Sequence, residues 1–349
     1  MNSHAQKLDS SNLQQNLQQS LQIGAVTVPN RIFLAPMSGV TDVPFRQRAA
    51  QAGAGLVVSE MVASQEFVKG SHESIKRSRP SGAGIHMVQL AGREAHWMGE
   101  AAKAIEAAGA DVIDINMGCP AKKVTGGYSG SALMRDLDHA MTLVEATVNA
   151  VGVPVTLKMR LGWDDNTINA PELAKRAEDA GVQMVTVHGR TRCQFYGGTA
   201  DWSAVRAVRE AISIPLTING DICDMPSAVE ALRLSGADAV MLGRAHYGRP
   251  WLAGDLANAR DGLTDLGLDL TSYVEAHYEA MLDHYGIETG LRHARKHLGW
   301  YLDAHAVDCP AQLRQRMLTE VNPKAVVECI RSAFDNRAVI ASTGERKAA

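Results

Sequence analysis

The chain has 349 residues, of which 46% are hydrophobic and 21% are charged, values typical of a folded globular protein. Its formal net charge of −3 does not indicate a nucleic-acid partner for the whole molecule, so any such contact must come from local basic patches. The five cysteines show no CxxC spacing, which argues against a disulfide framework or a cysteine-rich zinc site and favours a reducing cytoplasm.

The first twenty residues are rich in Gln, Ser and Asn and lack the apolar run of a signal peptide. We predict that residues 1–20 form a disordered tail, although Leu13, Leu17 and Leu21 have the spacing of a short helix. No stretch of the sequence is long and apolar enough to span a membrane.

Short apolar runs recur along the next part of the chain, and segments with helical spacing separate them. The runs are 32–35, 55–59, 85–90, 112–115, 155–159, 184–187, 216–218 and 239–242. Runs that are apolar throughout fit parallel strands covered on both faces. The pattern predicts an α/β fold, a (β/α)8 TIM barrel over residues 21–255. A doubly wound sheet is the rival, but the Gly-x-Gly-x-x-Gly turn expected of it is missing.

After about residue 252 the strand signal ends. Four amphipathic segments follow, around 271–285, 289–303, 311–319 and 324–336. They predict a smaller all-helical domain over residues 256–338, with a frayed tail at 339–349.

Active sites of such barrels form at the carboxyl ends of the strands, so residues directly after each run are candidates. The fourth run leads into Asn116-Met117-Gly118-Cys119-Pro120, which places Cys119 on a strand-to-helix loop. Free cysteines are more often inert and buried, but this location favours a function. Lys158 lies within the fifth run, where an ammonium needs a partner, so it is catalytic or an anion ligand. The alternative is a strand-end lysine whose ammonium extends to solvent.

Weaker candidates follow other runs. Alone, Pro36-Met37-Ser38 reads as a proline turn, Gln89 as a single amide, and His188 as a structural histidine. The seventh and eighth runs end in Asn219-Gly220-Asp221 and Gly243-Arg244. The loops after these two strands are the usual phosphate site of the fold, so a phosphate-bearing cofactor or substrate is expected there.

Basic residues cluster in two places outside the barrel strands. In the helical domain, Arg292, Arg295 and Lys296 share a helical face, with Trp300 four residues further on. A solvated face is the default reading, and contact with a phosphate backbone is the sharper one. A second basic patch comprises Lys69, Lys76, Arg77 and Arg79. His293 and His297 lack the zincin glutamate, and no metal site is expected.

Together these segments resemble the tRNA-dihydrouridine synthases, and most closely their bacterial B-type subgroup. The stretches are LAPMSGVTDVPFR, GAGLVVSEM, DINMGCPAKKV with GSAL, VPVTLKMRLGW, VHGRTR, IPLTINGDI and GADAVMLGRAHYGRPW, which run in order from about residue 31 to 252. The segment RKHLGWYL at 295–302 also resembles the family's helical RNA-binding domain.

The resemblance implies FMN at the barrel mouth, with NADPH or NADH as transient reductant. Lys158 would face the N1/O2 edge of the flavin, and Gln89 would hydrogen-bond its pyrimidine edge. The other implied flavin contacts are Pro36, Met37, Ser38, His188, Asn219, Gly220, Asp221, Gly243 and Arg244.

The implied reaction is reduction of uridine to 5,6-dihydrouridine in tRNA. Flavin N5 would deliver hydride to C6, and Cys119 would donate a proton to C5 of a base taken out of its stack. Asn116 would bind that base, and Arg292, Arg295 and Lys296 the tRNA backbone. A cytoplasmic monomer is expected.

Three other functions stay open from the residues. A dihydroorotate dehydrogenase type of flavin barrel would turn over free dihydroorotate. A Schiff-base aldolase using Lys158 would be colourless and trapped by borohydride. A non-catalytic RNA-binding protein would not need both Cys119 and Lys158.

Overall fold

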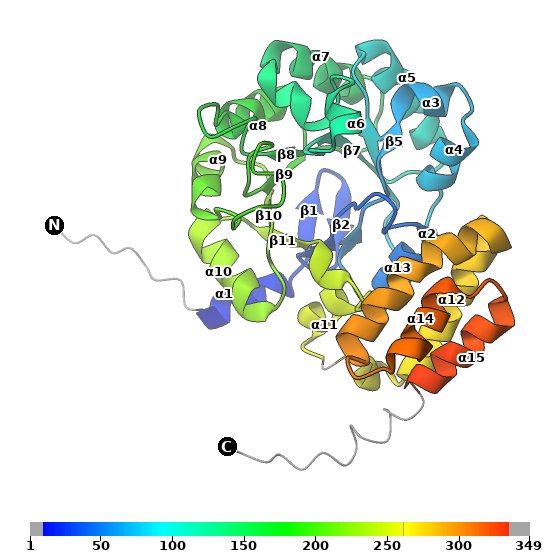
Figure 1. Cartoon of the computed structure of the whole chain (residues 1–349). Helices are drawn as coiled ribbons and strands as arrows, with labels where there is room; N and C mark the ends of the chain where they lie inside the picture. Colours follow the sequence, from blue (N-terminus) through cyan, green and yellow to red (C-terminus); the bar gives the residue numbers. More distant parts are fainter. Residues whose placement is uncertain (1–9, 261, 335–349) are drawn as a thin grey trace.

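A computed structural model describes residues 10–260 and 262–334, and its centre is a parallel β-barrel (Figure 1). The order of hydrogen-bonded strands is β4-β3-β11-β10-β9-β8-β7-β6-β5. A parallel bridge between Val58 and Met87 joins the two ends of this order. In chain order the strands are β3 (Ile32–Leu34), β4 (Leu56–Val57), β5 (Val62–Ala63), β6 (Met87–Ala91), β7 (Val112–Met117), β8 (Val155–Arg160), β9 (Met184–His188), β10 (Leu216–Asn219) and β11 (Ala239–Leu242).

The strands β4 and β5 are two parts of one broken barrel strand, since β4 pairs with β3 and β5 pairs with β6. At the break, the buried side chains of Ser59 and Glu60 accept hydrogen bonds from backbone N–H groups of neighbouring segments. Backbone N–H of Gln89 donates to Oγ of Ser59 at 3.0 Å, and that of Gly39 donates to Oε1 of Glu60 at 2.5 Å. Nine segments therefore form the eight strands expected, and the predicted TIM barrel is confirmed.

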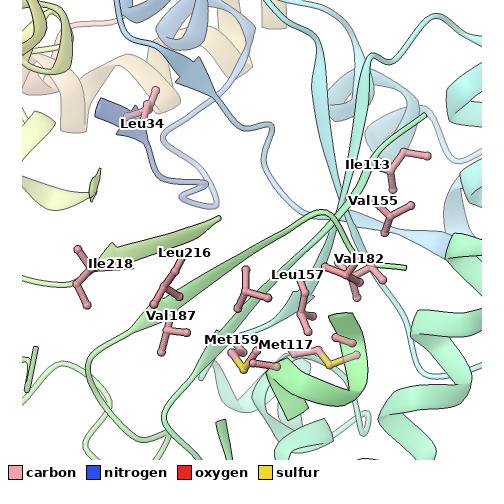
Figure 2. Packing of buried hydrophobic residues seen from close by; sticks show 14 of the residues in the cluster. Leu34, Ile113, Met117, Val155, Leu157, Met159, Val182, Val187, Leu216 and Ile218 are labelled. Atoms are coloured by element: carbon pink, nitrogen blue, oxygen red, sulfur yellow. The ribbon is translucent and has the colours of Figure 1, made fainter. Parts of the chain in front are cut away.

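Helices cover the outer face of the barrel because each strand is apolar on that face as well. Figure 2 shows part of this layer, where Leu157, Val187 and Leu216 lie among other buried side chains from neighbouring strands. The helices around the barrel are α2 (Val43–Gln51), α3 (Ser64–Val68), α4 (His72–Ser78), α5 (Ala95–Ala107), α6 (Lys122–Thr125), α7 (Leu137–Val148), α8 (Ala170–Asp179), α9 (Arg206–Ala211), α10 (Met225–Ser235) and α11 (Leu252–Asn258).

A β-hairpin closes the amino-terminal end of the barrel. Strands β1 (Leu21–Ile23) and β2 (Val26–Val28) pair antiparallel, and Figure 1 shows them in the middle of the ring of strands. Leu21, Ile23 and Val28 are buried in one cluster with Phe33 and Met184 of the barrel strands. This apolar floor leaves the carboxyl ends of the strands as the polar end of the barrel interior.

The disordered tail predicted for residues 1–20 is wrong for its second half. Ser10–Leu17 form helix α1, in which Leu13 and Leu17 are buried in the barrel's outer core. The leucine spacing was the correct signal, because an amphipathic helix gains stability from a surface to pack against, here α10. Residues 1–9 lie outside the described residues.

The helical domain consists of α12 (Leu270–Tyr285), α13 (Ile287–His305), α14 (Ala311–Thr319) and α15 (Pro323–Phe334). It has its own apolar core and packs on one side of the barrel (Figure 1). The ring of Trp300 stacks on Tyr247 with 3.8 Å between centroids, and Phe45 of α2 contacts His277 and His297. The predicted tail at 339–349 lies outside the described residues. No helix within the described ranges is apolar enough over sufficient length to cross a membrane.

Candidate active site

Polar side chains line the carboxyl-terminal half of the barrel interior. The strand register places Gln89 beside Asp114, Asp114 beside Thr156, and Asn116 beside Lys158. Residues two apart on a strand share a face, so these five side chains point into the barrel together. Gln89, Asp114, Asn116 and Thr156 are all buried. The site is therefore built on rigid strands above the apolar floor.

Four of these residues form one hydrogen-bonded chain. Oγ1 of Thr156 donates to Oδ1 of Asp114 at 2.6 Å, and Nε2 of Gln89 donates to Oδ2 of Asp114 at 2.6 Å. Nδ2 of Asn116 donates to Oε1 of Gln89 at 2.7 Å. Gln89 and Asn116, both sequence candidates, thus lie together, and each keeps one amide N–H free of these bonds.

Cys119 lies half-buried on the loop that leaves β7. Its backbone N–H donates to Oδ1 of Asn116 at 3.0 Å, and its carbonyl accepts from Oγ of Ser131 at 2.8 Å. Nε of Arg160 donates to the carbonyl of Gly118 at 2.9 Å. Burial raises the pKa of the Cys119 thiol above its ordinary value, outweighing a hydrogen bond from Ala121 and the charge of Arg160. The thiol is therefore protonated at neutral pH and able to act as an acid.

Lys158 points into the same interior from β8. Its Nζ donates to Oδ1 of Asn219 at 2.9 Å, and Nδ2 of Asn219 donates to the carbonyl of Met241 at 2.7 Å. Burial lowers the pKa of Lys158 to about 8, with Asp114 opposing the shift and Arg160 adding to it. The ammonium is held by a neutral amide, which leaves donors for an anionic ligand.

A group of cations surrounds His188 at the ends of β9 to β11. Burial, followed by the charges of Lys158 and Arg160, lowers the pKa of His188 well below its ordinary value. Among the described residues, Nδ1 of His188 is buried without a hydrogen-bond partner. An orphaned ring nitrogen amid positive charge fits a bound anion or a polar ligand atom.

Asp221 neutralises part of that charge. It forms ion pairs with Arg190 at 2.5 Å and Arg244 at 3.3 Å. Burial opposes ionisation of this carboxyl, but the hydrogen bonds from Arg190 keep its pKa below the ordinary value. The structure therefore brings Asp221 and Arg244 together, with the carboxylate directed at the two arginines.

Two glycines of the site have close neighbours that define their roles. Gly220 has φ of +119°, and a Cβ there would lie 2.8 Å from Cβ of Ala200 and 3.2 Å from Cε1 of His188. Glycine is required at this position. A Cβ on Gly243 would lie 3.7 Å from Sδ of Met37, so the segment containing Pro36, Met37 and Ser38 borders the loop after β11.

The basic cluster of the helical domain does not present one uniform face. Arg292 is exposed, whereas Nη2 of Arg295 donates to the carbonyl of Thr319 at 3.2 Å. Nζ of Lys296 lies 3.2 Å from the position of a Cβ on Gly39, at the barrel rim. Lys296 thus reaches towards the barrel and away from Arg292.

In the second basic patch, Lys76 and Arg77 contact other side chains of the protein. Nζ of Lys76 lies 4.5 Å from the ring centroid of Tyr285, and Nε of Arg77 pairs with Glu73 at 3.1 Å. In residues 10–260 and 262–334, no group of three or more His, Cys, Asp or Glu side chains is arranged to hold a metal ion.

Four residues of the site were missed by the sequence analysis. Asp114 lies two positions from Asn116, and Thr156 and Arg160 lie two positions on either side of Lys158, so the two-residue period of strands was the available signal. Arg190 is 1% exposed and donates to Asp221 and to the carbonyls of Gly197 and Gly198. No pattern in the sequence indicates that the Arg190 side chain is buried.

A cavity of about 520 Å³ lies away from this site. It is lined by Thr27 of the floor hairpin, by Pro29 directly after the hairpin, and by Gly53 and Gly55 at the join between α2 and β4. None of the polar chain or the cations around His188 borders it. The chemistry-bearing residues are at the opposite end of the barrel, and we place the active site there.

Comparison with known proteins identifies the family. The model for "Dihydrouridine synthase (Dus)" matches residues 33–338, which include the barrel strands, apart from Ile32 at the start of β3, and all four helices α12 to α15. The chain belongs to the dihydrouridine synthase family. Its members are enzymes, and the resemblance drawn from the sequence motifs is confirmed.

Curated relatives cover nearly the whole chain. A probable tRNA-dihydrouridine synthase of Rhizobium leguminosarum bv. phaseoli is 59% identical over 89% of this chain and 97% of its own length. A tRNA-dihydrouridine synthase B of Xanthomonas campestris pv. campestris is 43% identical over 90% of this chain and 96% of its own. The similarity to the B-type subgroup is thereby confirmed.

Solved structures share the fold at low identity. A morphinone reductase complex is 18% identical over 70% of this chain and 91% of its own, with a TM-score of 0.51. The old yellow enzyme from Trypanosoma cruzi is 16% identical over 71% of this chain and 93% of its own, with a TM-score of 0.54. At these identities the likeness supports the barrel fold.

Proposed function

We propose that this enzyme reduces uridine to 5,6-dihydrouridine in tRNA, using FMN and NADPH or NADH, with Cys119 as the acid that protonates C5. The observation that carries the proposal is the pairing of a protonated thiol with a buried cation at one barrel mouth. Cys119 follows β7, Lys158 lies on the neighbouring β8, and the charge of Lys158 acts on the pKa of the Cys119 thiol. The relatives named as tRNA-dihydrouridine synthases support the substrate.

The residues present fit a flavin. The orphaned Nδ1 of His188 and the donors left on Lys158 offer the polar contacts that an isoalloxazine with a phosphate tail needs. Lys158 would hold the N1/O2 edge, and Gln89 would offer its remaining amide N–H. The ring would lie against Pro36, Met37 and Ser38, and the tail or ring would be held by His188, Asn219, Gly220, Asp221, Gly243 and Arg244. When bound, FMN supplies the hydride that reaches C6 of uracil.

The protein's own groups then complete the reduction. A stacked base hides its C5–C6 edge, so the uridine has to leave the stack to enter the barrel mouth. Asn116 offers its free amide N–H to the base. As negative charge develops at C5 and O4, the Cys119 thiol donates its proton to C5, and the raised pKa of the thiol keeps that proton available.

The helical domain would bind the rest of the tRNA. Arg292, Arg295 and Lys296 are the proposed contacts, and the exposed Arg292 is the best placed of the three. We propose that the enzyme works as a monomer in the cytoplasm. The family match covers both the barrel and the helical domain, and this argues against the dehydrogenase and aldolase alternatives.

The decisive experiment compares Cys119→Ala with Cys193→Ala, a control at an exposed thiol. Loss of a general acid lowers the rate roughly 10²–10⁴-fold, so Cys119→Ala should form almost no dihydrouridine in tRNA while keeping its flavin absorbance near 450 nm. The control should match the wild type. Normal dihydrouridine levels in Cys119→Ala would overturn the assigned acid.

A further inference from the structure

The buried amide chain beneath Cys119 begins at Asp114, which has no part in the proposed reaction. Asp114 is 2% exposed, and both of its carboxylate oxygens accept hydrogen bonds, from Thr156 and Gln89. At the other end of the chain, Oδ1 of Asn116 accepts the backbone N–H of Gly118 at 3.2 Å and of Cys119 at 3.0 Å. One continuous path thus runs from the barrel interior to the loop that carries the thiol.

The direction of the side-chain bonds from Asp114 to Asn116 follows from Asp114. An ionised carboxylate only accepts, so Gln89 must turn its amide N–H towards it. The carbonyl end of Gln89 then faces Asn116 and accepts from Nδ2. Asn116 is left with its own oxygen facing the loop, where it meets two N–H groups.

A reversed amide would be costly at each position. If Asn116 turned over, its NH₂ group would face the backbone N–H of Cys119, and both would lose a hydrogen bond in a buried place. An unsatisfied buried polar group bears its full desolvation penalty. Gln89 cannot select its orientation alone, because an amide presents a donor and an acceptor of similar shape. The two loop N–H groups favour the same direction for Asn116 that Asp114 imposes through Gln89.

Asp114 suits this role because it is held as an acceptor. Burial raises the pKa of its carboxyl, while the hydrogen bonds from Thr156 and Gln89 and the charge of Lys158 favour the ionised form. The observed bonds are those of the ionised form, since Thr156 and Gln89 both donate to it.

We infer that Asp114 is a positioning residue: it fixes the direction of the Gln89–Asn116 amide chain and thereby holds the Cys119 loop in place. The consequence for proton transfer rests on the proposed function, but the effect on the loop does not. Catalytic geometry is sensitive to shifts of about 1 Å, which cost on the order of 10²-fold in rate.

The first test is Asp114→Asn, which keeps the size of the side chain and removes the fixed acceptor. Alkylation of each cysteine by iodoacetamide is followed by peptide mass spectrometry in the flavin-bound enzyme. We expect Cys119 to react at least about fivefold faster, as for the loss of roughly 1 kcal/mol of restraint. Exposed Cys223 is the internal control and should react as in the wild type. An unchanged rate at Cys119 would overturn the inference.

The second test restores the direction with a different residue. In Asp114→Asn combined with Gln89→Glu, the carboxylate moves one position along the chain, and Asn116 again faces an obligatory acceptor. The alkylation rate of Cys119 should return towards the wild-type value. A double variant that behaves like Asp114→Asn alone would overturn the inference. If Asp114→Asn does not fold, the inference is supported by a folded Asp114→Asn, Gln89→Glu double variant in which Cys119 is alkylated at the wild-type rate.

Turnover separates positioning from a merely structural role. For Asp114→Asn we expect kcat to fall roughly 10–100-fold, while KM for tRNA stays within about twofold, because the proposed contacts with the tRNA backbone lie in the helical domain. If Asp114 acted only as a counter-charge to Lys158, flavin binding would change and Cys119 alkylation would not. Failure of the proposed function would appear separately, as normal product from Cys119→Ala.

Discussion

The hydroxyl of Tyr285 donates to Oδ2 of Asp42 at 3.0 Å, joining two residues that are 243 positions apart in the chain. Asp42 caps helix α2 of the barrel through the backbone N–H of Phe45, and Tyr285 ends helix α12 of the helical domain. Glu60 and Lys296 act on the same carboxyl through their charges. This contact fixes how the two domains meet beside the active-site rim.

Replacing Asp42 with Asn should remove a pH-dependent loss of stability. Burial, with Glu60, raises the pKa of Asp42 from 3.8 to about 6 in the folded protein. A raised carboxyl pKa favours folding below about pH 4, and this contribution is lost as pH rises to about 6, by on the order of 3 kcal/mol. Asn caps a helix as well as Asp does. We expect Asp42→Asn and wild type to have similar Tm at pH 4, and the variant a higher Tm at pH 7. Parallel Tm curves over this range would contradict the pKa shift.

The sequence predicted what parallel strands determine locally. Asn219 directly follows an apolar run, Lys158 lies near the end of one, and Cys119 lies four residues after one. Because strand ends of a barrel meet at one rim, their proximity could be predicted. The helix at Ser10–Leu17 was indicated by its leucines, but its packing against α10 decides that it forms. Propensity alone does not hold so short a helix.

Side-chain direction on a helix surface and cross-strand partners could not be predicted in this way. Lys296 shares a helical face with Arg292 in the sequence pattern, yet the acidic residues Asp42 and Glu60 from the barrel attract it to the domain interface. The hydrogen bond between Asp114 and Gln89 joins β7 and β6. It depends on the register of these two strands, which cannot be derived from the sequence pattern. The floor hairpin Leu21–Val28 falls before the first apolar run and was not recognised as a separate element.

Arg190 and Arg244 bind the same carboxylate but should have different effects when removed. The Arg190 side chain is 2% exposed and that of Arg244 is 49% exposed. Arg190→Met leaves Asp221 with the ion pair to Arg244 and a hydrogen bond from the backbone N–H of Ala200 at 2.8 Å. Because Asp221 is also partly exposed, we expect the low end of the cost for breaking a buried pair, about 3 kcal/mol. Because the entropy of unfolding grows with chain length, that corresponds to a fall of roughly 4 °C in the Tm of the flavin-free protein.

Arg244→Met is the matched comparison. An exposed ion pair contributes about 0–1 kcal/mol, so the Tm of the flavin-free protein should change little. If Arg244 contacts the flavin, FMN affinity should fall in this variant. Equal losses of Tm in the two variants would show that burial of Arg190 does not decide its contribution.

FMN binding should report the charge of Lys158. Burial sets its pKa at about 8 in the flavin-free protein. If the ammonium donates to the flavin, binding raises that pKa, and affinity must fall as pH rises above about 8 because the neutral amine loses charge. Linkage predicts a Kd about tenfold higher at pH 9 than at pH 7, a range above the phosphate pKa of about 6. Lys158→Met should bind more weakly and with a flat profile. Lys175→Met, at an exposed lysine, should keep the wild-type profile. If the FMN affinity of Lys158→Met fell by the same factor between pH 7 and pH 9, the pH dependence would belong to another group.

The salt dependence of tRNA binding should separate Arg292 from Lys296. Each phosphate contact that is lost reduces the slope of log Kd against log salt by about 1. Arg292 is exposed, so Arg292→Gln should weaken binding and reduce the slope by about that amount. Lys296 is directed at Gly39 and the acidic residues of the interface, so Lys296→Gln should lower Tm with a smaller change in slope. The triple variant with Arg295→Gln should bind most weakly of all. Unchanged affinity of the triple variant at low salt would remove this helix face from the tRNA interface, because counterion release makes any phosphate contact strongest there.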